Sequence, residues 1–570
     1  MSDRTSPLLL LAFACAFALP GVAYAAWIPN GTPVATGALS QELPVALPDG
    51  AGGAYIAYLD GASGTLRPYL KRIGSDGVLD GAYGAGGVAL GKATGPNTTM
   101  GPVIADGPGG TLYVAWKDDS VRVQRMLGTS HALGWPLAGV ALCRNELAFS
   151  QYFNLKLAVD GTGAAHVFWD VNFDALGNSV AHATVTPAAG IAFRDCLGNG
   201  CGTDRYAGFL AVAGGQVVST YSASGTSGGN PANDIVVTWS PLGVSRSIDD
   251  NLYGCLAPAM RFGGAVAPSL GDHVIVAFRG GTAQRFSPDG AVTAQWLPVA
   301  GPLLLATPAF EHHPLAGVSD GAGGALFVFT DTREALPGPG LTVQAVNALG
   351  TVPGGWPADG AFVVPGAGFP QLGGAAPDGA SGIVLGWSRQ VGSDIALHAQ
   401  RVRAGGAIDP GWPAAGAPVS TIAGAKYLSS VVSDGFGGVL LLWQDRRGGD
   451  NDVYAMRVSA SGLVAPVVAV PPSAPAATGV RLSSGLPNPT RGAASFTLEL
   501  PQDAAVRARV VSLAGRDVAA LLRGAVLPAG PHVLRWDGRD SAGLAAAPGI
   551  YFLEVTVGGQ RIGRRIVRLP

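Results

Sequence analysis

Charged side chains are scarce in this sequence. Only 13% of the 570 residues are Asp, Glu, Lys or Arg, and the formal net charge is −2. That share is about half of what soluble domains usually carry. A chain with so little charge of either sign creates no long-range field that would attract nucleic acid or an acidic surface. We therefore expect no nucleic-acid partner.

Long apolar runs are scarce too. The longest, Leu8 to Leu19, follows Arg4 and precedes Ala23-Tyr24-Ala25. A basic residue, a short apolar core and a small-residue site are the parts of a secretory signal peptide. No later run approaches the 18 apolar residues that a membrane helix needs. The sequence predicts a signal peptide over residues 1–25 and an exported mature chain, secreted or on the outer cell surface, without a transmembrane segment.

Cysteine is also rare. Of the five cysteines, Cys15 lies in the expected signal peptide. The other four allow three pairings. Cys196 and Cys201 enclose only four residues and could close a small loop, which would leave Cys143 and Cys255 as the long pair. No second Cys/His pair stands at zinc-ligand spacing, so we expect disulfides rather than a metal site.

Glycine and proline are abundant, with 86 and 42 residues, yet hydrophobic residues make up 48% of the chain. Disordered low-complexity chains are rich in Gly and Pro but poor in large apolar residues. The combination found here predicts many short apolar strands separated by turns. At this length the chain is expected to form more than one domain or a repeat array.

One local pattern recurs along the chain. Ser433 to Gly462 shows it in full: an Asp-Gly-x-Gly-Gly turn, five apolar residues ending in an aromatic, a polar loop and a second, alternating run. With degenerate copies at Ala211–Tyr221 and Ser269–Phe278 there are eight repeats, whose aromatics lie 51 to 58 residues apart. The clear copies begin their turns at Asp49, Asp106, Asp160, Asp320, Asp378 and Asp434, and end their strands at Tyr58, Trp116, Trp169, Phe329, Trp387 and Trp443.

The strands of this repeat are apolar at consecutive positions. Because successive side chains of a strand point to opposite faces, both faces must be covered by neighbours. Four short strands in a unit of about 55 residues are typical of a propeller blade. We therefore predict an all-β chain with a seven- or eight-bladed β-propeller over residues 27–470. A string of β-sandwiches is the alternative, but the unit is short for an independent sandwich.

The repeats also carry a family likeness. Asp434 to Arg447 matches the pattern Asp-Gly-x-Gly-Gly, four residues, then Trp-x-Asp-x-Arg, and Asp320 to Arg333 matches it with Phe in place of Trp. This resembles the repeats of exported bacterial β-propeller proteins. The resemblance covers Trp27 to about Val470 and implies architecture only, because propellers host many functions.

A different module follows a Pro- and Ala-rich stretch, residues 471–479, which has the composition of a linker. Alternating strand patterns in residues 480–570 predict a small β-sandwich. Its distinctive residues are Asn488, Pro489, Gly515, Arg516, Trp536, Asp537, Gly538, Gly549 and Tyr551. In this order they resemble the Ig-like domain named after the flagellar hook-capping protein FlgD, and they are similar to the C-terminal sorting domains of type IX secretion cargo.

That resemblance implies export to the cell surface, with the module sorting or attaching the protein through a secretion or cell-envelope component. The segment from Trp536 to Gly543 favours the FlgD-like form. The basic final strand, with Arg561, Arg564, Arg565 and Arg568, could contact phosphates or a secretion component. A charged edge strand that resists aggregation is the preferred interpretation.

Motifs for catalysis are weak. Gly317–Gly321 and Gly225–Gly229 both fit Gly-x-Ser-x-Gly, but the first lies inside a repeat turn and the second in a Ser/Gly loop. A nucleophile elbow needs a strand, a turn and a helix. His312 and His313 are neighbours on a strand and would point in opposite directions. We assign no catalytic residue.

The segment after Trp443 contains three carboxylates, Asp445, Asp450 and Asp452, that could hold a structural Ca²⁺ through oxygen ligands. They lack EF-hand order, and a solvated loop is preferred, so no cofactor is expected. Recurring carboxylates also suggest turn formation rather than the acid pair of a glycosidase.

Together these features favour a non-enzymatic binding or scaffold protein. Its propeller would bind a glycan or a protein through variable loops, including the insertion Asp195–Arg205. One alternative is a secreted hydrolase, a glycosidase or peptidase, with non-repeating acidic or His residues at one mouth of the ring. Another is a structural cell-envelope spacer without a ligand.

Overall fold

A computed structural model gives the fold of the chain. It describes residues 27–569 except 92–99, 145–150, 173–177, 196–204, 214, 228–229, 241–243, 250–264, 279–280, 289–290, 292, 294–295, 297–302, 305–311, 334–337, 465–479, 483–487, 489, 491, 501, 513–514 and 528–529. The expected signal peptide, the linker, Pro489 and Cys196, Cys201 and Cys255 lie outside the described residues. No helix in the described part of the chain is long and apolar enough to cross a membrane.

The described chain is nearly all β-structure. Residues 32–458 form eight antiparallel sheets of four main strands, here called the first to eighth repeat sheets. The first sheet consists of β2 (Gln41–Pro48), β3 (Ala54–Asp60), β4 (Arg67–Ile73) and β5 (Val88–Ala89), and the second of β6 (Val103–Gly107), β7 (Thr111–Lys117), β8 (Ser120–Leu127) and β10 (Val140–Arg144), with β9 (Ser130–His131) beside β8. The third consists of β11 (Gln151–Val159), β12 (Ala165–Asn172), β13 (Asn178–Val185) and β14 (Ile191–Asp195), and the fourth of β15 (Arg205–Ala213), β16 (Gln216–Ser227), β17 (Asn230–Ser240) and β18 (Val244–Asp249).

The second half of the array repeats this order. The fifth sheet consists of β19 (Ala265–Pro268), β20 (Val274–Phe278), β21 (Thr282–Phe286) and β22 (Leu303–Leu304), and the sixth of β23 (His312–Ser319), β24 (Ala325–Asp331), β25 (Gly340–Val346) and β26 (Ala361–Val364). The seventh consists of β27 (Gln371–Pro377), β28 (Ile383–Val391), β29 (Asp394–Val402) and β30 (Ala417–Ser420), and the eighth of β31 (Lys426–Ser433), β32 (Val439–Asp445) and β33 (Asp452–Val458), completed by β1 (Thr32–Ala35). Strand β1 pairs with β33, with Thr32 opposite Ala455, so the two ends of the array share one sheet.

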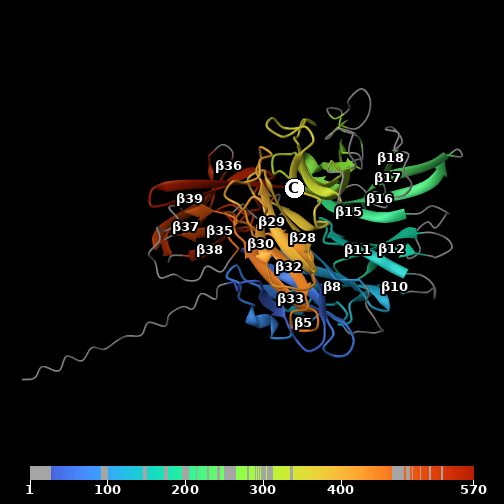
Figure 1. Cartoon of the computed structure of the whole chain (residues 1–570). Helices are drawn as coiled ribbons and strands as arrows, with labels where there is room; N and C mark the ends of the chain where they lie inside the picture. Colours follow the sequence, from blue (N-terminus) through green and yellow to red (C-terminus); the bar gives the residue numbers. More distant parts are fainter. Residues whose placement is uncertain are drawn as a thin grey trace, which may run out of the picture.

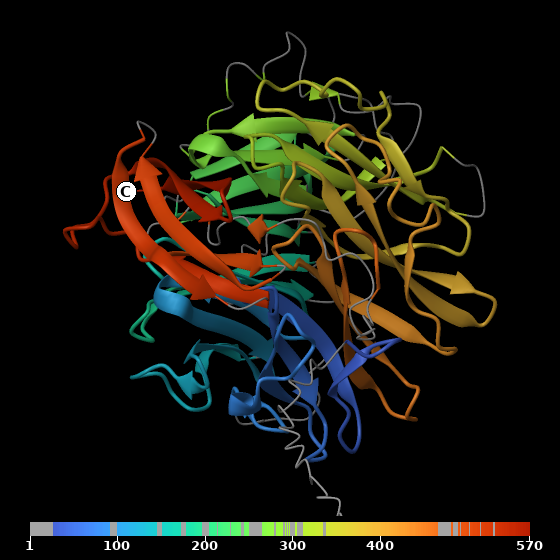
Figure 2. The same ribbon diagram turned by 90° about the vertical axis from the view of Figure 1, so that its left-hand side faces the viewer.

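The eight sheets are arranged around a centre. The first strand of each sheet contacts the first strand of the next, and β31 of the eighth sheet contacts β2 of the first, which closes the cycle. In Figure 2 the sheets succeed one another around the molecule in the order of the colour bar, from blue through green to orange. The fold is therefore all-β and propeller-like, as the repeat pattern predicted.

The consecutive apolar residues explain this stacking. Val439 to Trp443 of β32 are all fully buried. Their core cluster includes Ile56 from the first repeat sheet and Val384 from the seventh. Both faces of the strand are thus covered by neighbouring sheets, where burial contributes roughly 25 cal/mol per Å² of apolar surface. A single repeat would leave these faces in water and would not be stable alone.

A tryptophan hydrogen bond links neighbouring sheets. In the Gly-Trp-Pro segment between β29 and β30, Trp412 donates its indole N–H to the carbonyl of Ala460 in the eighth sheet, at 3.0 Å. Gly462, with a φ of 77°, lies against the face of the same indole. Equivalent bonds run from Trp27 to Ser75, Trp135 to Pro187, Trp296 to Ala348 and Trp356 to Ala404. These tryptophans therefore join each of these sheets to its neighbour.

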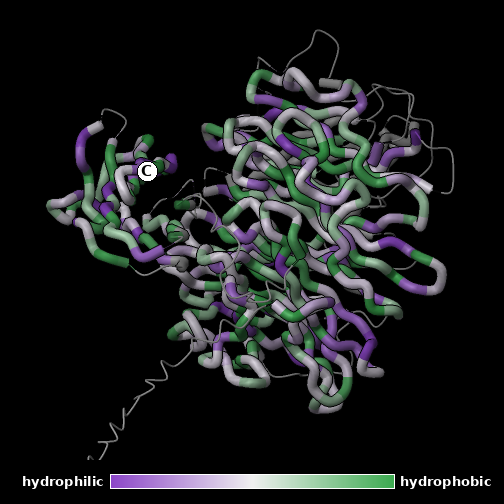
Figure 3. The backbone as a smooth tube through the Cα atoms, turned by 60° about the vertical axis from the view of Figure 1, so that its left-hand side comes forward, coloured by the Kyte–Doolittle hydropathy of each residue, from purple (hydrophilic) through white to green (hydrophobic). Residues whose placement is uncertain are grey.

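The C-terminal strands form a separate lobe beside the larger body (Figure 3). One sheet has the order β34 (Arg481–Leu482), β35 (Ala494–Leu500) and β38 (Gly530–Trp536), and the other β37 (Asp517–Leu527), β36 (Ala504–Ser512), β39 (Gly549–Val557) and β40 (Gln560–Arg568). Both sheets contribute to one core, which includes Phe496, Trp536 and Leu553. Figure 1 shows the strands of this lobe in red and dark orange.

Candidate functional site

The repeat turns are built by their aspartates. Oδ1 of Asp434 accepts the backbone N–H groups of Phe436 and Gly438, at 2.7 and 2.9 Å. Its Oδ2 accepts Arg457 Nε from the third strand, at 2.9 Å. The Oδ1 pattern recurs at Asp49, Asp160, Asp320 and Asp378. These residues stabilise the turns of the repeat sheets.

Two copies vary this device. Asp160 bonds His166 Nε2 at 3.0 Å in place of an arginine. Burial would raise the pKa of Asp160, but the hydrogen bonds from His166, Thr162 and Ala164 outweigh this effect and lower the pKa to about 2. Asp106 differs more. Its turn has one extra residue and forms a 3-10 segment, and Asp106 is exposed, with no hydrogen bond to its carboxylate among the described residues. The expected equivalence of Asp106 to its sisters is therefore wrong in detail.

The repeat aromatics are framework residues as well. All six, Tyr58, Trp116, Trp169, Phe329, Trp387 and Trp443, are almost fully buried. A carboxylate stands two residues after the aromatic, at the end of the second strand opposite to the Asp-Gly turn, and it binds the loop that follows this strand. In the eighth sheet, Asp445 Oδ2 accepts Trp443 Nε1 at 3.0 Å and forms an ion pair with Arg447 at 2.5 Å. The guanidinium of Arg447 lies 3.7 Å from the centre of the Tyr454 ring.

The seventh repeat sheet departs from this arrangement. Arg389 stands two residues after Trp387, at the position that Asp445 occupies in the eighth sheet. Trp387 stacks on His398 of β29, with ring centres 5.6 Å apart. Trp387 Nε1, Arg389 Nε and His398 Nδ1 are buried and have no hydrogen-bond partner in the described structure. Burial, and secondly Arg389, lowers the pKa of His398 to about 4, so its ring is neutral at pH 7.

Three exposed apolar side chains lie on segments that flank this position. Phe369 precedes β27, Val391 ends β28 and Tyr427 is the second residue of β31; they are 54%, 52% and 58% exposed. We call these three residues with Gln390 and Arg389 the rim site. A hydrogen bond from Gln390 N to Gly368 O, at 2.7 Å, ties the β28–β29 turn to the Phe369 segment.

The rim site continues to the eighth sheet. Asp394 Oδ1 accepts the N–H of Gly424 at 2.8 Å, which fixes the β29 end against the segment before Tyr427. Lys426 donates to the carbonyl of Ile395. Phe369 itself has a φ of 49°, a left-handed conformation that costs a bulky residue about 1–2 kcal/mol. A strained, exposed aromatic gains little from packing, so the site is a candidate for ligand contact.

A pair of carboxylates lies at the neighbouring strand ends of the eighth sheet. Asp445 and Asp452 are directly opposite each other on β32 and β33. Burial would raise the pKa of Asp445, but hydrogen bonds from Arg447 and Trp443 outweigh it and keep it below its ordinary value. Burial raises the pKa of Asp452. Such opposite shifts are found in acid–base pairs, although these carboxylates are only 2% and 8% exposed.

The other chemical motifs of the sequence form no site among the described residues. Within the described residues no three His, Cys, Asp or Glu side chains gather to hold a metal, so the Ca²⁺ hypothesis on Asp445, Asp450 and Asp452 gains no support. Ser319 ends β23 and leads through a turn into another strand, whereas a nucleophile elbow leads into a helix. His312 is buried, 3.9 Å from Asp331.

Cys143 takes part in a disulfide bond, and its partner lies outside the described residues. The pairing therefore stays a prediction.

The distinctive C-terminal residues hold the lobe together. Asn488 bridges to β40, accepting the N–H of Val567 and donating to the carbonyl of Arg565. Trp536 is fully buried and donates its indole N–H to Arg539 O at 2.7 Å. Gly515 and Gly538 adopt φ values of 75° and 78° in turns, and the hydroxyl of Tyr551 donates to Ala547 O.

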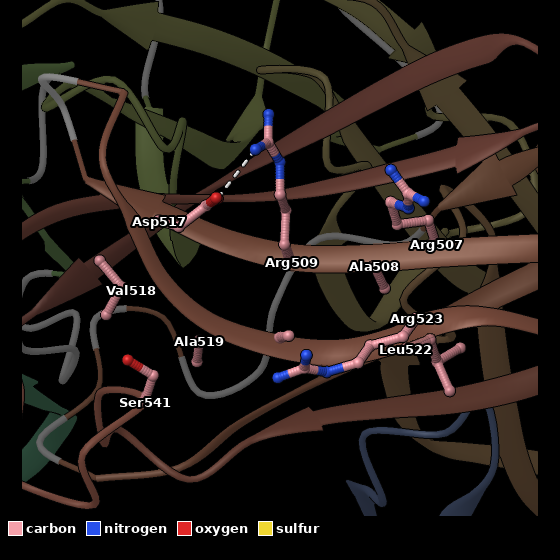
Figure 4. A pocket seen from close by; sticks show the side chains of 10 residues that line it. Arg507, Ala508, Arg509, Asp517, Val518, Ala519, Leu522, Arg523 and Ser541 are labelled. Carbon is pink, nitrogen blue, oxygen red and sulfur yellow. Dashed lines mark hydrogen bonds and ion pairs between the residues drawn. The ribbon is translucent and has the colours of Figure 1, made fainter.

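An open cavity of about 400 Å³ lies along β36 and β37 of this lobe (Figure 4). Arg509 bonds Asp517 at 2.8 Å and Glu554 at 2.9 Å. Arg507 lies directly opposite Arg523, and both are exposed. Like charges in direct opposition are unfavourable, which makes this cavity a second surface suited to an anionic contact.

The comparisons with known proteins identify no family. No family model matches the chain, and no curated protein does. The similar solved structures include PorZ, described as a surface component of the type-IX secretion system of Porphyromonas gingivalis (11% identity, 94% of this chain and 99% of that chain, TM-score 0.19). Polysaccharide lyase Uly1 (11%, 72% and 88%, 0.36) and acylaminoacyl peptidase from Pyrococcus horikoshii (7%, 69% and 56%, 0.35) are others. The chain thus spans little over half of that peptidase.

Other similar structures are a sialidase, an endo-arabinase and a glucose dehydrogenase. Most of these neighbours are hydrolases, lyases or surface proteins. At such low TM-scores and identities none of them supports an assignment for this chain, so the function has to be argued from its own residues.

Proposed function

We propose that this protein is an exported, cell-surface or secreted binding protein. In this proposal the eight repeat sheets are the blades of a β-propeller and residues 480–570 are an Ig-like sandwich. The rim site binds a glycan, and the C-terminal lobe sorts the protein or attaches it to the cell envelope. The closed cycle of first strands and the shared β1–β33 sheet support the blade assignment.

The observation that carries the binding proposal is the exposure of Phe369 and Tyr427 at one edge of adjacent sheets. Gly373 of β27 lies against the side chain of Leu428, so the segments that bear the two aromatics run side by side. Aromatic rings with nearby amides and charged groups are typical of sites that bind amphipathic ligands. A sugar offers both an apolar ring face and hydroxyl groups, which suits this combination.

An oligosaccharide array provides the test. The full-length protein is expected to bind some glycans, and Phe369→Ala and Tyr427→Ala are expected to weaken that binding at least tenfold. Phe193→Ala is the matched control, because Phe193 is an exposed aromatic of β14 in the third sheet. Binding that survives both rim substitutions would contradict the assignment of the site. An array with no glycan bound would favour the spacer interpretation or a protein ligand.

The role of the C-terminal lobe is tested separately. In the native host, the full chain is compared with a chain that ends at Thr478 by surface labelling and intact mass. Retention of the shorter chain inside the cell, or loss of the lobe from the mature surface form, is expected of a sorting signal. If both chains travel alike and the lobe is kept, sorting is refuted and attachment is favoured.

A hydrolase is the second candidate, and one observation favours it. The pKa values of Asp445 and Asp452 are moved in opposite directions, as a general acid and its partner require. Hydrolysis of an array glycan by the protein, abolished by Asp452→Asn, would support the enzyme. Hydrolysis that persists in this variant would remove the pair from consideration.

A further inference from the structure

Four repeat sheets place a carboxylate at the same structural position. It lies two residues after the buried aromatic of the second strand, and each carboxylate is neutralised or hydrogen-bonded locally. Asp445 bonds Trp443 and Arg447, and Asp118 is paired with Arg122. Equivalent residues are Asp60, which accepts Gln41 Nε2, and Asp331, which bonds Arg333 and Thr342.

In the seventh sheet the indole donor of this arrangement is present, but the carboxylate acceptor is absent. Trp387 retains the indole N–H that an aspartate accepts in the eighth sheet, but Arg389 replaces that aspartate. No ion pair of Arg389 is found among the described residues, and the indole and His398 Nδ1 beside it are unpartnered. An unsatisfied buried donor costs about 1–3 kcal/mol. The position is therefore electropositive and lacks an anion that its sister sheets supply themselves.

We propose that the rim site takes glycans that carry a carboxylate, such as uronic acids, and that this carboxylate pairs with Arg389, the residue that replaces the aspartate. This inference rests on the proposed function and names its ligand class. Trp387 and Arg389 lie on the same face of β28, two residues apart, and His398 is directly opposite Trp387. The three groups thus belong to one side of one sheet.

Access to this position is provided by the rim itself. Arg389 is only partly buried, and the next two residues of β28, Gln390 and Val391, are exposed. The nearest acid along the chain, Asp394, accepts a backbone N–H of the neighbouring segment with its Oδ1. A planar guanidinium binds a carboxylate through two parallel hydrogen bonds, which gives geometric selectivity as well as strength. The sugar ring would then lie against Phe369, whose ring is next to Gly338 of the sixth sheet, the sheet that the Trp387 face of β28 packs against.

The test uses the full-length protein and acidic oligosaccharides such as oligogalacturonates and oligoglucuronates, each as the free acid and as its neutral methyl ester. We expect the free acids to bind at least tenfold more tightly than the esters. Arg389→Asp recreates the sister sequence and is expected to abolish this preference while the sheet still folds. Arg535→Ala, which removes an exposed arginine of β38 outside the cavity of the C-terminal lobe, is the charge-matched control and should leave binding unchanged.

The outcomes separate this inference from the proposed function. Equal binding of acids and esters, lost in Phe369→Ala, would overturn the carboxylate inference and leave glycan binding in place. Binding of acids that persists in Arg389→Asp would overturn the assignment to Arg389. If no acid or ester binds while neutral glycans on an array do, the carboxylate inference also falls; if no glycan of any kind binds, both fall.

Discussion

The contrast between Asp434 and Asp106 tests whether the repeat turns work as described. The two residues begin the same sequence motif, but Asp434 is buried and accepts two backbone N–H groups and Arg457, whereas Asp106 is exposed. Asp434→Ala leaves both N–H groups without an acceptor, at about 1–3 kcal/mol each, and removes the partner of a partly exposed arginine. We expect a loss of about 3–5 kcal/mol in the free energy of unfolding. Asp106→Ala should change it by less than about 0.5 kcal/mol.

The measurement is urea unfolding of the full chain followed by tryptophan fluorescence. A lower midpoint at an unchanged slope would report lost stability of the folded state rather than a change in the denatured state. Asp434→Asn keeps an oxygen acceptor for the turn and removes only the charge, so its loss should be smaller than that of the alanine variant. Equal losses for Asp434→Ala and Asp106→Ala would refute the reasoning, because the two sites would then be equivalent despite their different bonding.

Three further predictions concern other parts of the array. Trp412→Ala removes an inter-sheet hydrogen bond and a buried indole and should cost about 3–5 kcal/mol in urea unfolding, whereas Trp412→Phe keeps most of the packing and should cost less. The pKa of His398 is lowered to about 4, below its unfolded value of about 6.5, so the unfolded chain binds its proton more tightly. The free energy of unfolding should therefore be complete above pH 6.5 and fall between pH 6.5 and 4. In His398→Phe this pH dependence should be flatter. Phe369→Gly relieves a left-handed φ of 49° and should raise stability by about 1 kcal/mol while weakening glycan binding, and a drop in melting temperature would contradict the strain argument.

Much of the architecture could be predicted from the sequence because the repeat expresses it eight times. Consecutive apolar residues such as Val439 to Trp443 require cover on both faces, and only stacked sheets provide it. The turn role of Asp434 follows from the chemistry of a short carboxylate next to glycines. In contrast, the completion of the eighth sheet by β1 depends on contacts between residues more than 400 positions apart, which no local pattern encodes.

The rim site could not be predicted from the repeat pattern for a physical reason. Phe369 lies in a connecting segment outside the repeat motif, and its exposure depends on how that segment is tied to Gln390. Arg389 carried a usable signal: aligning the repeats places it where four sister sheets have aspartate. A comparison of polar positions between repeats, in addition to the apolar ones, would have marked it.

Function in a repeat array should therefore be sought where one copy departs from the others in charge. The framework aspartates recur because every sheet needs the same turn, so none of them can distinguish one ligand-binding edge from seven inert ones. The replacement of aspartate by Arg389 reverses the sign of one charge at a position whose indole donor, Trp387, remains in place. An aspartate at this position would accept the indole N–H, as Asp445 does from Trp443 in the eighth sheet. We therefore expect Arg389→Asp to make the free protein more stable as it abolishes the preference for acidic glycans.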